Sequence, residues 1–186
     1  MLTAQSLHPG YDALENSVSR LIFSPFGWLQ TMNYYLLALF TAAFGMMVYL
    51  GIAQSRAARM GSLLLMVTGL IPLLVAVFRV DVNPSGPNTL PYIIHKVVAA
   101  AGGVSFPLGE LLLVPELRSD ERWRCVSPVT VAAAVTVLTL QLGEVSVFIV
   151  PHLIAPWFGL YERVLLSIPL AWMMVMSARF LYIRCR

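Results

Sequence analysis

The 186-residue chain contains five stretches of apolar residues, each with about as many residues as a helix needs to cross a membrane. An α-helix needs about 20 residues to cross a hydrocarbon core about 30 Å thick. Because a bilayer offers no water to backbone N–H and C=O groups, such stretches cross it as helices. The sequence therefore predicts an all-α, polytopic transmembrane helical bundle with spans at about 28–52, 61–80, 92–114, 127–150 and 164–183.

Arginine and lysine are distributed unevenly between the two sides of this predicted bundle. Lys96 and three arginines, Arg20, Arg79 and Arg163, lie on one side, in the longer segments. Short basic loops stay in the cytoplasm, so the C-terminus is predicted inside and, with five spans, the N-terminus outside. The predicted cytoplasmic side carries eight of the twelve basic residues: Arg56, Arg59, Arg118, Arg122, Arg124, Arg179, Arg184 and Arg186.

Residues 1–27 precede the first span and are too polar to cross the bilayer. From residue 9 onward they mix polar residues with large apolar ones, which is typical of a segment that lies in the membrane interface. The N-terminus lacks the charged start and apolar run of a signal peptide, so the first span is expected to target itself. We therefore divide the chain into an extracytoplasmic interfacial or re-entrant segment, 1–27, and a five-helix transmembrane bundle, 28–186.

The composition limits the classes of function. Hydrophobic residues make up 59% of the chain and charged residues 11%, with a net charge of +3. The basic residues punctuate the spans and do not form a soluble basic face, so lipid headgroups explain them and nucleic acid does not. Cys125 and Cys185 fall on the predicted cytoplasmic side, where disulfides are rare. No metal-binding or phosphate-binding motif occurs, and the sequence names no cofactor.

Glu144 is the most informative polar residue, because a charge near the centre of a span costs about 2.5–3.5 kcal/mol on insertion scales. Gln141 lies three residues earlier and therefore on the same helix face. One interpretation is a proton-active or substrate-binding carboxylate. The other is an interhelical hydrogen bond or ion pair, with Arg79 or Arg163 as the partner. The sequence leaves both open.

Asp81 and His95 bracket the outer loop between the second and third spans. An Asp–His pair is typical of a general base or of two metal ligands. A zinc site needs a third ligand, and His152, Glu162 and His8 lie on the same side in separate segments. The structural alternative is a surface ion pair of Asp81 with Lys96 or Arg79. We take Asp81, His95 and Glu144 as catalytic candidates and assign no metal ligand.

Glu162 and Arg163 begin the fifth span. An acidic residue at a helix N-terminus is favoured by the helix dipole by about 0.3–1 kcal/mol, which accounts for Glu162. Arg163 is unfavourable at the same position and is expected to find a carboxylate or a lipid phosphate. Together with Arg79 and His152, these two residues are candidates for ligand or lipid binding.

The third span contains a stripe of small residues with one acidic residue beyond it. Ala99, Gly103 and Pro107 follow one another at four-residue spacing, which predicts a face that packs closely against another helix. Glu110 lies nearer the inner end of this span, where we expect it to reach the interface and pair with Arg118.

Three motifs occur in an order that is similar to that of a known family. The chain resembles, over essentially its whole length, the uncharacterised bacterial integral membrane proteins grouped as domain of unknown function 998. The resemblance implies a bacterial inner-membrane protein and no particular activity. The motifs are His8-Pro9-Gly10-Tyr11-Asp12 with Ser17-Val18-Ser19 and Gly27-Trp28-Leu29-Gln30, then Phe78-Arg79-Val80-Asp81 followed by His95, then Gly159-Leu160-Tyr161-Glu162-Arg163.

The chain departs from this family pattern at two points. Family members usually begin with one more transmembrane helix before the Pro-Gly-Tyr segment, and this chain starts almost at that segment. The family also tends to have a second histidine four residues before His95, where this chain has Pro91. The resemblance therefore does not imply a pair of histidine metal ligands here.

Two functions of different classes fit the sequence. The first is a non-enzymatic role, as an accessory or stabilising subunit of a membrane complex or as a lipid-binding bundle, with membrane lipids and other membrane subunits as partners. The second is an intramembrane enzyme that acts on a lipid or prenyl-type substrate from the extracytoplasmic side through Asp81, His95 and Glu144. Proton transport through Glu144 is a third, but polar residues do not continue from it to the inner face. Whether the chain is an enzyme stays open.

Overall fold

The structure is a computed structural model and describes residues 10–79, 89–146 and 155–184. Its helices confirm the prediction of an all-α bundle with five stretches long and apolar enough to cross a membrane. The last residues of the fourth predicted span, 147–150, lie outside the described ranges. The five spans are α2 (Gly27–Gly51), α3 with α4 (Arg56–Thr68 and Ile71–Val77), α5 (Leu90–Ser119), α6 (Ser127–Ser146) and α7 (Phe158–Arg184).

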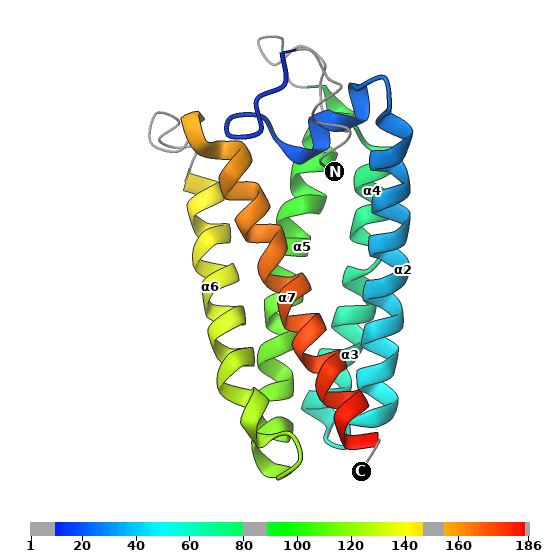
Figure 1. Cartoon of the computed structure of the whole chain (residues 1–186), viewed down its shortest axis with the longest axis vertical. Coiled ribbons are helices and arrows are strands. Elements are labelled where there is room, and N and C mark those ends of the chain that lie inside the picture. The colour runs from blue at the N-terminus through cyan, green and yellow to red at the C-terminus, as the bar shows by residue number, and fades with distance from the viewer. Residues whose placement is uncertain (1–9, 80–88, 147–154, 185–186) are drawn as a thin grey trace.

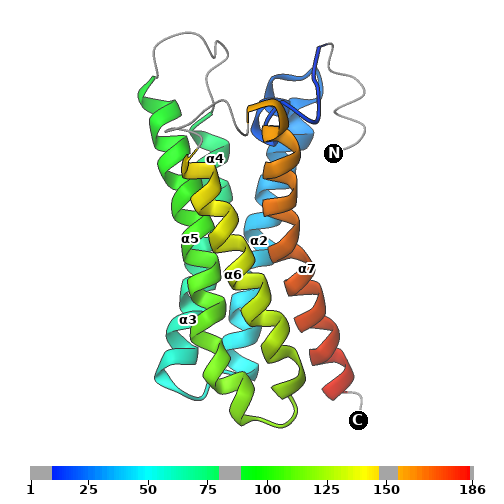
Figure 2. The same ribbon diagram turned by 90° about the vertical axis from the view of Figure 1, so that its left-hand side faces the viewer.

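The helix α5 is the central element of the bundle. It packs against α3 and α6, and α3 packs in turn against α2. The helix α7 crosses the face that is turned to the viewer in Figure 1. Residues 10–26, here called the cap segment, lie across one end of the bundle and include the short helix η1 (Val18–Phe23). We call this the cap end, and the opposite end, with the end of α7, the arginine end (Figures 1 and 2).

The core of the bundle is centred on Trp172 of α7, which is 2% exposed. Phe44 of α2 and Phe106 of α5 meet its ring edge-on, with ring centroids 5.2 and 5.7 Å away. Edge-to-face pairs of this kind are favoured by the charge distribution of the rings. The Trp172 indole N–H donates a 2.9 Å hydrogen bond to the hydroxyl of Thr130 on α6. One side chain therefore joins four helices.

The second span is broken, whereas the sequence predicted one continuous helix over 61–80. The helix α3 ends at Thr68 and α4 begins two residues after Gly69. Pro72 has no N–H to donate to the Thr68 carbonyl, so the helical hydrogen-bond ladder stops there. At the break, the Thr68 hydroxyl lies 2.8 Å from the Ser105 hydroxyl on α5. Gly69 lies so close to α2 that a methyl group added to it would clash with the α2 backbone. The break lies where three helices meet.

Candidate functional site

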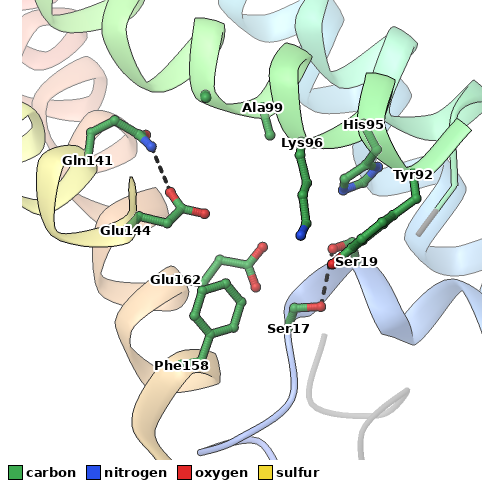
Figure 3. A pocket seen from close by; sticks show the side chains of 11 residues that line it. Ser17, Ser19, Tyr92, His95, Lys96, Ala99, Gln141, Glu144, Phe158 and Glu162 are labelled. Atoms are coloured by element: carbon green, nitrogen blue, oxygen red, sulfur yellow. Dashed lines mark hydrogen bonds between the residues drawn. The ribbon is translucent and has the colours of Figure 1, made fainter. Parts of the chain in front are cut away.

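A partly enclosed pocket of about 110 Å³ lies at the cap end, where the cap segment meets α5, α6 and α7. Figure 3 shows both of its carboxyl groups and its lysine ammonium group turned toward the same space. The polar groups come from four separate parts of the chain. They are Ser17 and Ser19 of the cap segment, His95 and Lys96 of α5, Glu144 of α6 and Glu162 of α7.

Glu144 is held in the pocket wall by its neighbour on the same helix. The Gln141 side-chain amide donates a 2.8 Å hydrogen bond to Glu144 Oε2, as their three-residue spacing allows. Gln141 is itself buried against Gly103 of α5, where a Cβ would occupy the place of the amide. In the part of the chain that the structure describes, neither Arg79 nor Arg163 forms an ion pair with Glu144.

Glu162 connects the pocket to the cap segment. It lies on α7, just after the first turn, and its Oε2 accepts a 2.6 Å hydrogen bond from the backbone N–H of Val18. The carboxylate thereby satisfies a backbone donor at the start of η1 and also lines the pocket. The sequence predicted Glu162 at the start of this helix, where the helix dipole favours an acidic residue. The helix begins four residues earlier, at Phe158, and no acidic residue lies in its first turn.

His95 and Lys96 are consecutive residues of α5 and form the opposite wall. His95 is 7% exposed, and its Nδ1 lies 2.6 Å from the Phe78 carbonyl oxygen, which ties α5 to the end of α4. Lys96 Nζ lies 4.1 Å from the centroid of the Tyr92 ring. A pocket role for Lys96 was not predicted from the sequence. The four-residue spacing of an aromatic residue and a lysine was the signal available for it.

The predicted site residues that the structure describes outside this pocket are Arg79 and Arg163. Arg79 is exposed and does not line it. Asp81 and His152 lie outside the described residues, as does His8. Of the three catalytic candidates, His95 and Glu144 therefore share the pocket and Asp81 stays a prediction. No group of three His, Cys, Asp or Glu side chains within 10–79, 89–146 and 155–184 is placed to hold a metal ion.

Arg163 points away from the pocket and fastens the cap segment to α7. Its guanidinium donates hydrogen bonds to the carbonyl oxygens of Ala13 at 2.7 Å, of Asn16 at 3.3 Å and of Gly159 at 2.7 Å. It also donates one to the hydroxyl oxygen of Tyr11 at 2.6 Å. The sequence led us to expect a carboxylate or a phosphate as its partner. In the structure its partners are mainly backbone carbonyl oxygens, and no sequence pattern predicts such partners.

Tyr11 and the first turn of α7 complete this attachment. Burial raises the pKa of the Tyr11 hydroxyl. This hydroxyl donates a hydrogen bond to the Ser17 carbonyl oxygen at 3.0 Å. The Leu160 N–H donates a 3.0 Å hydrogen bond to the Leu14 carbonyl oxygen. Gly159 has no side chain and so lets the cap backbone approach this closely. The Gly-Leu-x-x-Arg motif is thus the docking site of the cap segment beside the pocket.

The contact between α6 and α7 near the pocket depends on a glycine. The Tyr161 hydroxyl donates a hydrogen bond to the Leu140 carbonyl oxygen and occupies the space where Gly143 lacks a Cβ. We expect Gly143→Ala to push the ring away and to lower the free energy of unfolding by about 1–3 kcal/mol, as overpacking does. Tyr161→Phe is the matched control and removes only the hydrogen bond, at a cost of about 0.5–1.5 kcal/mol. Thermal unfolding in nanodiscs measures both, and equal stability of Gly143→Ala and the native chain would contradict this contact.

The fold and the pocket define a class: a multi-pass helical membrane protein with a polar pocket near one end of its bundle. The chain belongs to the family described as Protein of unknown function (DUF998), whose model matches residues 1–179. The resemblance found in the sequence is thereby confirmed. No curated protein and no solved structure matches the chain.

Proposed function

We propose that this chain is a lipid-binding membrane protein whose pocket at the cap end holds a headgroup with both a phosphate and a primary ammonium group. The observation that carries the proposal is that Glu144 and Glu162, from different helices, line one small pocket together with Lys96. Two carboxylates that face the same space repel each other; Lys96 offsets part of that repulsion, and a second cation between the carboxylates offsets more of it. An ammonium group donates three hydrogen bonds and so suits a pair of carboxylates.

The other side of the pocket supports the phosphate half of the headgroup. Lys96 supplies a positive charge, which is the usual partner of a phosphate. The hydroxyls of Ser17 and Ser19 lie 3.3 Å apart and line the same wall. A pocket of about 110 Å³ is much smaller than the roughly 300–1,000 Å³ of a site that encloses a drug-sized ligand. It suits a headgroup whose acyl chains lie outside it, along the apolar helices.

The proposal extends to the setting of the protein. The arginine distribution favours an orientation with the cap end outside and the C-terminus in the cytoplasm. The family resemblance implies a bacterial inner membrane. The lipid would then enter from the outer leaflet, under the cap segment that Arg163 holds against α7. Other membrane subunits remain possible partners of the bundle, because its lipid-facing and partner-facing surfaces are both apolar.

The test compares lipid retention by native mass spectrometry after exchange into equal amounts of phosphatidylethanolamine, phosphatidylcholine and phosphatidylglycerol. We expect phosphatidylethanolamine to be retained preferentially, and the double variant Glu144→Gln with Glu162→Gln to weaken its binding about tenfold, or 1.4 kcal/mol. Glutamine can still accept the bonds from Gln141 and Val18, so the variant removes charge and keeps the fold. Glu116→Gln, at the arginine end of α5, is the control and should leave retention unchanged.

Three results would count against this function. Equal retention of phosphatidylglycerol would show that the ammonium group is not recognised. Unchanged retention by the double variant would place the lipid elsewhere. A stoichiometric complex with other chains and no retained lipid would favour the accessory-subunit role.

An enzyme that uses the same pocket is the second candidate, because His95 and Glu144 both line it. A general base needs an imidazole held in a fixed orientation, and the contact of His95 Nδ1 with Phe78 holds the ring. In the same mass spectra, lipids that have lost a headgroup or an acyl chain, and that are absent with His95→Gln, would indicate turnover.

A further inference from the structure

Glu110, in the core of the bundle, is the one buried carboxyl group among the described residues whose two oxygens both lack a hydrogen-bond partner. It lies on α5, and its side chain is 0% exposed. Ser119, at the end of α5, is nine residues further on, about 13 Å along the helix at about 1.5 Å per residue. The sequence predicted that Glu110 reaches the interface and pairs with Arg118. That prediction is wrong, because Arg118 Nε donates to the Ser127 hydroxyl instead.

The surroundings of Glu110 are apolar. On its own helix, Phe106 lies one turn earlier and Leu113 and Val114 one turn later, all three buried. Neither Glu110 oxygen has a hydrogen-bond partner among the described residues, and no ion pair there involves it. The titratable and charged residues of α3, α5, α6, α7 and η2 (Arg124–Val126) within the described ranges therefore make no hydrogen bond or ion pair with it. They are Arg56, Arg59, Tyr92, His95, Lys96, Glu116, Arg118, Arg124, Cys125, Glu144, Tyr161, Glu162, Arg163, Arg179 and Tyr182.

A carboxyl group in these surroundings is far less costly with its proton than without it. An ionised carboxylate that is buried without a partner costs several kcal/mol even after the protein relaxes. A neutral polar group left without a hydrogen bond costs about 1–3 kcal/mol. The closed bundle therefore accommodates Glu110 as the neutral acid, which carries one removable proton.

The residue before Glu110 lies at a close crossing of the α3 and α5 backbones. A methyl group on Gly61 of α3 would lie 2.7 Å from the carbonyl oxygen of Gly109, the residue before Glu110. Pro107 and Pro115 lie on either side within α5, and each removes one N–H from its hydrogen-bond ladder. The segment around Glu110 thus depends on packing against α3 more than an uninterrupted helix would. Separation of α5 from α3 is the movement that would expose the carboxyl group.

We infer that Glu110 is a proton-binding site in the core of the bundle, and that it exchanges its proton with water only when α5 separates from α3 at the Gly61–Gly109 crossing. The ligand of this site is the proton itself. The site is independent of the pocket at the cap end, which lies toward the opposite end of α5.

Infrared difference spectroscopy of the protein in nanodiscs tests this inference. We expect a carboxylic acid C=O band that is present in the native chain and in Glu116→Gln, but lost in Glu110→Gln. After transfer to D₂O the band should shift slowly, because the deuteron enters only through opening. Gly61→Ala should speed that shift about tenfold or more if its methyl weakens the crossing by about 1.4 kcal/mol. A band that does not depend on Glu110, or one that never shifts in D₂O, would overturn the inference.

Labelling by a hydrophobic carbodiimide is a second test of this inference, and it uses the native chain without a substitution. The protonated carboxyl adds across a C=N bond of the reagent to give an O-acylisourea, which rearranges to a stable N-acylurea without losing any atom. Only an acid that is both protonated and transiently reachable reacts in this way. Peptide mass spectrometry is expected to find the adduct on Glu110, and its absence after prolonged incubation would contradict proton exchange at this site.

Discussion

Glu110→Met is expected to stabilise the bundle by about 1–3 kcal/mol, the cost of burying a neutral polar group without a hydrogen bond. The reason is that Glu110 lies in the core with neither oxygen bonded among the described residues. Methionine is unbranched like glutamate and adapts to the space that the carboxylate stem leaves. Unfolding in bicelles, followed by denaturant or by steric trapping, measures the change.

Glu116→Met is the matched control for this prediction. Glu116 lies on the same helix, and its Oε2 accepts a 2.9 Å hydrogen bond from the backbone N–H of Ser55. Its replacement should leave stability unchanged or lower it. A loss of stability in Glu110→Met would show that the carboxyl group has a partner that the described residues do not include, and it would also weaken the case for a removable proton there.

Arg163→Met is expected to give the largest decrease in the free energy of unfolding. The substitution keeps the aliphatic stem and removes the guanidinium that binds three backbone carbonyls and the Tyr11 hydroxyl. A hydrogen bond to a charged group is worth about 1.5–3 kcal/mol. We expect a loss of about 3 kcal/mol, the upper end of that range, since such bonds are not additive and the site is partly exposed. Hydrogen exchange at Val18 and Leu160 should accelerate as the cap segment detaches.

Arg179→Met is a control on the same helix at the arginine end. Arg179 also donates to a backbone carbonyl, that of Arg122, at 2.8 and 2.6 Å, but Arg122 is exposed and Arg179 is only half-buried. Its loss should change stability by less than about 1 kcal/mol. If Arg163→Met leaves amide exchange in the cap segment as slow as in the native chain, then Arg163 does not hold that segment.

The spans and one local pair were predictable because they depend on properties that are local in sequence. Hydropathy adds up along the chain, so each long apolar stretch is visible without knowledge of its neighbours. The three-residue spacing of Gln141 and Glu144 places them on one face whatever surrounds the helix. Proline also acts locally, and Pro72 was the signal for the break in the second span, although the sequence analysis did not use it.

The pocket was less predictable, because its walls come from segments far apart in the chain. Glu144, Glu162 and His95 were singled out one by one, but their meeting depends on how α5, α6 and α7 are rotated about their axes. In a membrane protein the lipid-facing and bundle-facing sides are both apolar, so hydropathy does not reveal that rotation. It is set by close contacts such as Gln141 on Gly103.

The sequence by itself thus determined that the chain is a five-span helical membrane protein of its family, with polar groups concentrated toward one side. Only the tertiary structure decided that Arg163 binds the cap segment, that two carboxylates and a lysine share one pocket, and that Glu110 is buried without a partner. The physical reason is that crossing a bilayer is a requirement on each helix separately. The environment of a polar side chain is instead set by the packing of several helices at once.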